Sequence, residues 1–226
     1  HIFILSSSGK PIFTRYGDEQ EMVTTFGLLQ AVISIALDSG DTIRCIRAGK
    51  RKIVYLLKNT LYFISISSTE EPEVVLLKQL NFLYNQILLV LTSKVHDVFK
   101  NNPAADIRQL LGPDTTRLLS LSCEPIITPI PIAFECLNSL TCYKELREEI
   151  ILYLSHTVNE SNAAILIYHV PRKHCNTNIY LKPITYIDNI DILLLTHFVA
   201  NSKSLRSNDH NWVPLCMPEF NSTGFL

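Results

Sequence analysis

The chain has 226 residues, of which 47% are hydrophobic and 18% charged, a composition that supports packed cores and excludes a disordered protein. Its 20 basic and 21 acidic residues leave a net charge of -1, so no overall field attracts nucleic acid or an anionic membrane. We therefore expect no nucleic-acid partner, and any binding must be local.

The sequence begins with His1 and shows no charged leader before an apolar run, so we expect no secretory signal and interpret the chain as a piece of a longer protein. Its longest uninterrupted apolar runs fall short of the roughly 20 residues that cross a bilayer, so we expect no membrane span. The six cysteines lie at irregular intervals without a C-x-x-C pair, which is typical of reduced cytosolic thiols.

Residues 2–5 and 11–16 predict two short strands, because apolar and β-branched residues flank a turn rich in serine and glycine. A helix follows over residues 18–38, with Asp18 as its N-cap. The next segments predict an antiparallel meander of three strands, at residues 41–47, 52–57 and 61–67. We expect Pro11 and the first meander strand to lie at sheet edges.

The helix over residues 18–38 is apolar on nearly every side. One row at helical spacing would cover a sheet face: Met22, Phe26, Leu29, Ile33 and Leu37. A second apolar row lies beyond it: Val23, Leu28, Val32 and Ile35. A helix that is apolar all round is normally buried all round, so we expect a second surface to cover this one.

The same helix carries a stripe of small side chains that would let another backbone come close: Thr24, Gly27, Ala31 and Ser34. Two interpretations stay open, because the stripe could pack on the domain's own sheet or against a partner. On the second interpretation, the partner-binding residues are Thr24, Gly27, Leu28, Ala31, Ser34 and Ile35.

Helical segments dominate the next part of the chain, at residues 72–91, 95–99 and 106–121. The first of them has a core face of Leu76, Leu80, Leu83, Ile87 and Leu91. Its solvent side is expected to hold Lys78, Asn81 and Asn85. Three closely spaced prolines then mark a boundary, so we divide the chain into a first domain (1–122), a proline-rich connector (123–132) and a second region (133–226).

The second region predicts a helix at 133–155, a hairpin from 164–168 and 178–181, a helix at 186–200 and a strand from Leu215. A hairpin followed by a helix repeats the order of the opening, so we interpret the region as a connecting helix and part of a second domain of the same kind.

The sequence lacks the motifs of covalent catalysis and nucleotide binding. Neither Gly-Lys pair has the spacing of a phosphate-binding loop, and no hydrolase or metalloprotease motif occurs. His169, His174 and Cys175 lie close together, but no fourth ligand has suitable spacing, so we predict no metal and no cofactor.

A single basic cluster surrounds the first turn of the meander: Arg44, Arg47, Lys50, Arg51 and Lys52. A solvated turn explains it, and so does contact with an anionic membrane through Lys50, Arg51 and Lys52.

The order strand, strand, helix, three strands, helix resembles that of longin domains, which are profilin-like. The opening, His1 to Ser6 with Ser8 to Phe13 and Arg15-Tyr16-Gly17, is similar to that of the vacuolar fusion protein Mon family. Trp212 to Pro218, followed by Glu219-Phe220-Asn221, resembles the family's W-x-P-x-C-x-P-x-F-N segment. Together with Leu110-Leu111-Gly112 between them, these matches cover the chain in order.

The resemblance implies an α+β fold: a longin domain with a five-stranded antiparallel sheet flanked by helices, followed by the start of a second longin-like domain. It also implies a subunit that pairs with the Ccz subunit, longin domain to longin domain. The heterodimer would be a guanine nucleotide exchange factor for the Rab GTPase of late endosomes and vacuoles, the Rab-seven type, in membrane trafficking and fusion.

The resemblance further implies a cytoplasmic protein, peripheral on late endosome and vacuole membranes. Such an exchange factor acts by binding and is not an enzyme in the covalent sense. The alternative is a longin adaptor or scaffold in vesicle trafficking that leaves nucleotide exchange unchanged.

Overall fold

The computed structural model describes residues 1–17, 19–103, 105–123, 143–161, 166–168, 178–180, 187–202 and 213–225. Its centre is an antiparallel sheet in the order β2-β1-β5-β4-β3. The strands are β1 (Ile2–Ser6), β2 (Pro11–Thr14), β3 (Cys45–Ala48), β4 (Arg51–Lys58) and β5 (Leu61–Ser67). The predicted five-stranded antiparallel sheet flanked by helices is confirmed, and the strands with Pro11 and with Arg47 lie at its two edges, as predicted.

Strand β3 begins later than the sequence predicts. Residues 41–44 were expected to belong to it, but they form the loop that ends the preceding helix. The backbone amide of Asp41 donates to the carbonyl of Ala36, and the Asp41 carboxylate accepts from the amide of Thr42. These local bonds compete with strand pairing, because aspartate readily bonds to the backbone beside it.

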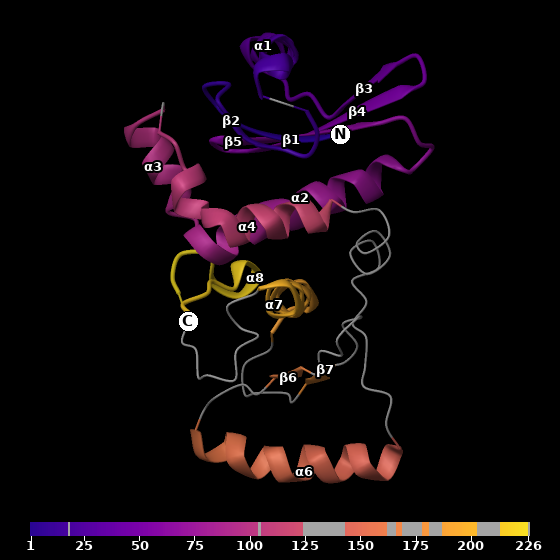
Figure 1. Cartoon of the computed structure of the whole chain (residues 1–226), viewed down its shortest axis with the longest axis vertical. Helices are drawn as coiled ribbons and strands as arrows, with labels where there is room; N and C mark the ends of the chain where they lie inside the picture. The colour runs from indigo at the N-terminus through magenta and orange to yellow at the C-terminus, as the bar shows by residue number, and fades with distance from the viewer. Residues whose placement is uncertain are drawn as a thin grey trace.

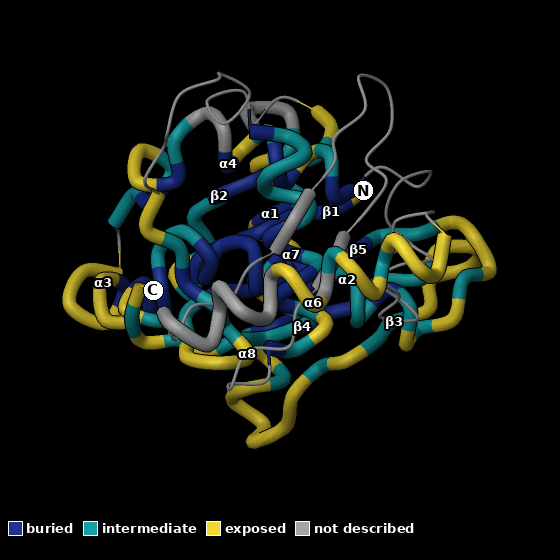
Figure 2. Tube along the Cα trace, turned by 90° about the horizontal axis from the view of Figure 1, so that it is seen from below, coloured by how far each residue is buried: buried dark blue, intermediate teal, exposed yellow. Residues whose placement is uncertain are grey.

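Two helices cover the two faces of the sheet (Figure 1). Helix α1 (Glu19–Asp38) packs on one face, against a cluster that includes Phe3, Leu5 and Ile64. Helix α2 (Glu73–Leu91) packs on the other, against Ile4 and Phe63 among others. Since successive residues of a strand point to opposite faces, strand β1 is buried along its whole length. Figure 2 shows the buried stretches gathered in the middle of the molecule and the exposed ones around its rim.

Helices α3 (Val95–Asn101) and α4 (Arg108–Ser122) follow as predicted, and α4 packs beside α2. Gly112 has a φ of 68° inside α4 and kinks it. Asp18, the predicted N-cap of α1, lies outside the described residues.

A further layer covers the outer side of α2. Helices α7 (Asn189–Asn201) and α8 (Pro218–Asn221) lie there, so that α2 is enclosed between them and the sheet (Figure 1). The buried contacts of this layer come from Phe82, Leu89, Leu194 and Leu195. The layer brings residues more than one hundred positions apart into one core.

Two predictions fail at this layer. Asn85 was expected on the solvent side of α2, but it is buried and its side-chain amide donates to the Glu219 carboxylate at 2.9 Å. The strand expected from Leu215 is replaced by α8, because Pro218 occupies its first turn and the Asp191 carboxylate accepts the amides of Glu219 and Phe220.

The remaining described elements are α6 (Lys144–Ser161), β6 (Leu166–Tyr168) and β7 (Asn178–Tyr180). Strands β6 and β7 form the predicted hairpin, and α6 extends beyond the predicted helix end at residue 155. Of the proline-rich connector only Cys123 is described, so the division into 1–122, 123–132 and 133–226 stays a prediction.

Within the described ranges, α2 is the helix that is long and apolar enough to cross a membrane by length and composition. Half of its most apolar window is buried inside the molecule, and both sides of the helix have protein neighbours. A core helix gives the same pattern.

Candidate interaction surface on helix α1

Helix α1 has one buried face and one exposed face. Phe26, Leu29 and Ile33 are at most 4% exposed and pack on the sheet, as the first apolar row predicts. Leu37 of that row is 42% exposed, because it lies in the last turn of the helix, where Ala36 is half-buried and the residues from Leu37 to Gly40 face solvent.

The second apolar row lies largely in solvent. Val23, Leu28 and Ile35 are 64%, 65% and 67% exposed, and Val32 is half-buried. Burying a side chain of this size is worth roughly 1.5–3 kcal/mol, so their exposure leaves a large part of the helix's burial potential unused.

The six predicted partner-binding residues come together on this exposed face. Thr24, Gly27, Leu28, Ala31 and Ile35 are exposed, and Ser34 is half-buried at the margin. Because the face points away from the sheet, the interpretation that the small-residue stripe packs on the domain's own sheet does not hold. Gly27 is open, since a Cβ atom built there would have no neighbour within 4 Å.

A polar anchor fixes the rotation of α1 about its axis. The Gln30 side-chain amide donates to the carbonyl of Ser7 at 2.9 Å, beside the turn between β1 and β2. A Cβ atom on Gly9 would lie 3.2 Å from Gln30 Cγ, so glycine lets the turn and the helix approach closely. Since φ at Gly9 is +83°, the turn also needs glycine's conformational freedom.

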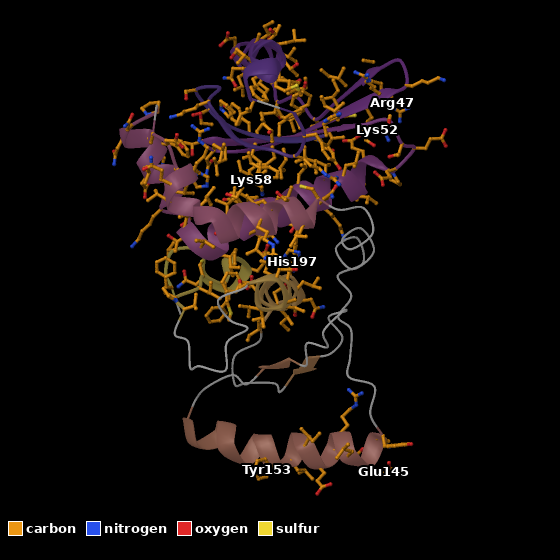
Figure 3. All side chains as sticks on the ribbon, viewed as in Figure 1. Arg47, Lys52, Lys58, Glu145, Tyr153 and His197 are labelled. Atoms are coloured by element: carbon orange, nitrogen blue, oxygen red, sulfur yellow. The ribbon has the colours of Figure 1, made fainter. Side chains whose placement is uncertain are left out.

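The basic cluster occupies the β3–β4 hairpin and the residues before it. Arg44, Arg47, Lys50 and Arg51 are exposed, and Lys52 is half-buried. The ammonium of Lys52 donates to the carbonyl of Glu71 at 2.5 Å. Figure 3 shows Arg47 and Lys52 at the end of the sheet, away from α3.

The buried titratable groups belong to the packing of the molecule. His197 of α7 accepts from the side-chain amide of Gln86 at 3.0 Å, and burial lowers the pKa of His197 to about 4 (Figure 3). Burial also raises the pKa of Asp191 to about 6, although the two amides that it accepts oppose this shift. His96 lies 2.8 Å from Thr60 Oγ1 and its pKa is lowered, first of all by burial.

These groups do not form a reactive site within the part of the chain that the structure describes. An apolar cavity of about 360 Å³ lies between β4, α2 and α7, and its lining includes Leu56, Phe82 and Leu193 but none of these titratable groups. The described residues contain no group of side chains that could hold a metal ion. His169, His174 and Cys175 lie outside the described residues.

Comparison with known proteins places the chain in a family. Residues 1–120 match the family model described as the first longin domain of FUZ, MON1 and HPS1. The chain belongs to this family. Among its relatives it is similar to the vacuolar fusion protein MON1 homolog of Oryza sativa subsp. japonica, with 35% identity over 228 residues, and to the vacuolar fusion protein MON1 of Yarrowia lipolytica, with 36% identity over 237 residues.

These matches confirm the resemblance to the Mon family. Protein SAND of Takifugu rubripes is 30% identical over 232 residues. The three alignments cover 99–100% of the chain, but only 39%, 41% and 43% of the relatives' own lengths in the order given. The chain thus spans about two fifths of the relatives that it matches.

The sequence analysis did not predict that α7 and α8 pack on the outer side of α2. The signal available for it was the apolar pair Phe82 and Leu89 on the side of α2 opposite its predicted core face, together with buried Asp191 in an otherwise apolar helix.

Proposed function

We propose that the chain is part of a trafficking protein that acts in vacuolar fusion, as a subunit of a heterodimeric guanine nucleotide exchange factor. Helix α1 pairs with the Ccz subunit, and the two subunits together receive a Rab-seven-type GTPase. The protein works in the cytoplasm, peripherally on late endosome and vacuole membranes. Family membership supports the trafficking role, and the exposed face of α1 is the observation that supports the partner.

An exchange factor of this kind needs no catalytic acid or base. Its binding energy stabilises a GTPase conformation that holds magnesium and nucleotide weakly, so the nucleotide leaves faster. The chain's own contribution is a rigid surface. Leu28 and Ile35 supply apolar area, while Gly27 and Ala31 let a partner's backbone approach between them.

The test is release of fluorescent GDP from the GTPase in the presence of this chain, Ccz, or both. Gly27→Trp and Ala31→Trp should lower the acceleration at least about tenfold, because they fill the space that the partner needs. Ser120→Trp is the matched control, since Ser120 is also an exposed small residue, on helix α4 over the opposite face of the sheet.

Each outcome has a distinct meaning. Acceleration that survives Gly27→Trp and Ala31→Trp would exclude α1 as the contact and leave exchange itself in place. Co-purification with Ccz and the GTPase without any acceleration would instead support the adaptor or scaffold alternative. Equal unfolding midpoints for the two α1 variants and the unchanged chain would show that they act on the contact alone.

A further inference from the structure

The cavity between β4, α2 and α7 is larger than the gaps that ordinary packing leaves. Its volume is about 360 Å³, whereas protein interiors hold few voids larger than a water molecule. Binding sites for small molecules begin at roughly 300 Å³. Six of the eight lining side chains are apolar: Leu56, Val74, Leu77, Phe82, Ile190 and Leu193. The cavity therefore has the size and the lining of a ligand site.

Water fills such a space poorly. An ordered water needs about two to four polar partners, and the lining offers the side chains of Lys78 and Asn81. An apolar wall that faces neither protein nor ligand also lacks the close contacts that the rest of the core makes. An apolar ligand would supply those contacts.

The cavity follows the axis of α2. That helix contributes five lining residues at helical spacing from Val74 to Phe82, which corresponds to a rise of about 12 Å. Val74 is 63% exposed and Phe82 is 4% exposed, so the cavity opens near the start of α2 and deepens toward Phe82. This course suits a linear chain that enters at Val74.

The lining carries one positive charge and no negative one. Lys78 is half-buried, and a lysine of this kind lays its stem along apolar surface while its ammonium group stays in water. Side chains of a helix lean toward its N-terminus, so Lys78 covers the turn that carries Val74, at the mouth. Glu73, the acidic residue next to Val74, lies beside the Cys45 thiol and is not part of the lining.

Asn81 completes the polar side of the lining. It is half-buried and lies three positions after Lys78, on the same side of α2. A carboxylate at the mouth would therefore meet a cation and an amide donor, and bonds of this charged kind are the stronger ones. The lining thus fits a molecule with an apolar body and an anionic end.

We propose that this cavity binds a fatty acid, with its aliphatic chain along α2 and its carboxylate at Lys78. Ile190 and Leu193 lie more than one hundred positions after the lining residues of α2, so the cavity is complete only when α7 packs there. Leu56 packs on the sheet face opposite α1, so the ligand and a partner on α1 do not compete. The proposal does not depend on exchange activity.

The experiment is isothermal titration calorimetry of the whole chain with decanoate below its micelle concentration. We expect a single decanoate to bind, and hexanoate far more weakly, since each buried methylene contributes about fourfold. Decyltrimethylammonium has the same chain and the opposite charge, so it should bind about fivefold more weakly than decanoate. Absence of decanoate binding would overturn the site, as would uptake of many molecules per chain. Equal binding of the two head groups would overturn the carboxylate assignment.

A bulky side chain at the mouth tests the location. Val74→Trp should lower the affinity for decanoate at least about tenfold, because the ring fills the entrance of the cavity. The matched control is Val98→Trp, since Val98 is also an exposed helical valine, 39% exposed on α3, and does not line the cavity. The control should change the affinity less than about twofold. Equal losses in the two variants would overturn the location.

A charge reversal tests the carboxylate contact without filling the cavity. Lys78→Glu should reverse the order of decanoate and decyltrimethylammonium, whereas Lys100→Glu on α3 should leave the order unchanged. If Lys78→Glu keeps the order, Lys78 does not hold the anionic end.

Linkage to stability and the oligomeric state complete the test. Saturating decanoate should raise the unfolding midpoint of the unchanged chain and leave that of Val74→Trp where it is, because a ligand stabilises the state that binds it. A dimer in size-exclusion chromatography that Val74→Trp abolishes and decanoate does not affect would assign the cavity to a second copy of the chain. Binding to phospholipid vesicles that decanoate displaces would assign it to an acyl chain within a membrane. Either result would overturn the free fatty acid as the ligand.

Discussion

Helices α1 and α2 are each apolar on two sides, but they differ in how many of those sides the rest of the chain covers. Helix α2 is covered on both sides, by the sheet and by α7 with α8. Helix α1 is covered on one side and keeps Leu28 and Ile35 about two-thirds exposed on the other. Two-sided apolar character therefore predicts two contacts, but whether the second comes from the same chain depends on segments far away in sequence.

The largest expected difference in stability is between a shortened side chain in the layer over α2 and one on the exposed face of α1. Leu194→Ala, in the layer over α2, should lower the free energy of unfolding by about 2–5 kcal/mol, because Leu194 is 0% exposed and leaves a cavity. Leu28→Ala, on the outer face of α1, should change it by less than about 0.5 kcal/mol. Chemical denaturation of both variants measures the difference. Similar losses would mean that α1 is also covered by its own chain.

The second prediction concerns the pH dependence of the layer over α2. Asp191 has a folded pKa of about 6 against 3.8 in its ordinary state, so folding binds a proton there and stability falls as pH rises from 3.8 to 6. His197 has a folded pKa of about 4 against 6.5, so its contribution falls as pH drops from 6.5 to 4. The two effects oppose one another, each by roughly 3 kcal/mol.

In the unchanged chain the contributions of Asp191 and His197 should nearly cancel between pH 4 and 6.5, which leaves the loss toward acid pH that the lowered pKa of His96 contributes. The two variants should depart from this profile in opposite directions. Asp191→Asn removes the carboxylate and keeps an oxygen acceptor for only one of the two amides, those of Glu219 and Phe220, so the variant should be less stable at every pH and should lose further stability toward acid pH. His197→Gln should drop in the opposite direction, toward neutral pH. Urea titrations at several pH values measure both slopes, and parallel profiles in the two variants would contradict the assignment.

The comparison of the two helices also shows what sequence can predict. The exposed face of α1 follows from residue spacing alone, because helical geometry places Gly27, Ala31 and Ile35 on one side whatever surrounds them. The role of Asn85 could not be predicted in that way. Its partner, Glu219, lies 134 positions later, and a polar residue on α2 reads as solvent-exposed until that segment is in place.

The same distinction applies to the sheet. Strand β5 has the predicted bounds, since its apolar run ends at turn residues on both sides. Strand β3 was predicted four residues too early because Ile43 and Arg44 fit a strand pattern, while the bond from Asp41 to Ala36 belongs to the end of α1. The charged edge at β3 was predictable. The polar hollow that this edge forms with Ser68 and Thr69 was not, because those two residues follow a different strand, β5.

The smallest expected effect tests whether the exposed face of α1 is free of contacts at Gly27, its smallest residue. Gly27 has space around it and lies within a regular helix, so Gly27→Ala should raise the free energy of unfolding of the chain alone by about 0.4–1 kcal/mol, through a less flexible unfolded state. Thermal unfolding measures the gain, with Ala31→Gly as the reverse change on the same face. A loss with Gly27→Ala would mean that part of the chain packs against Gly27. A gain in the chain alone combined with weaker binding to Ccz would locate the partner's closest approach at Gly27. Helix α2 has no such open position, because its own chain encloses it on both sides.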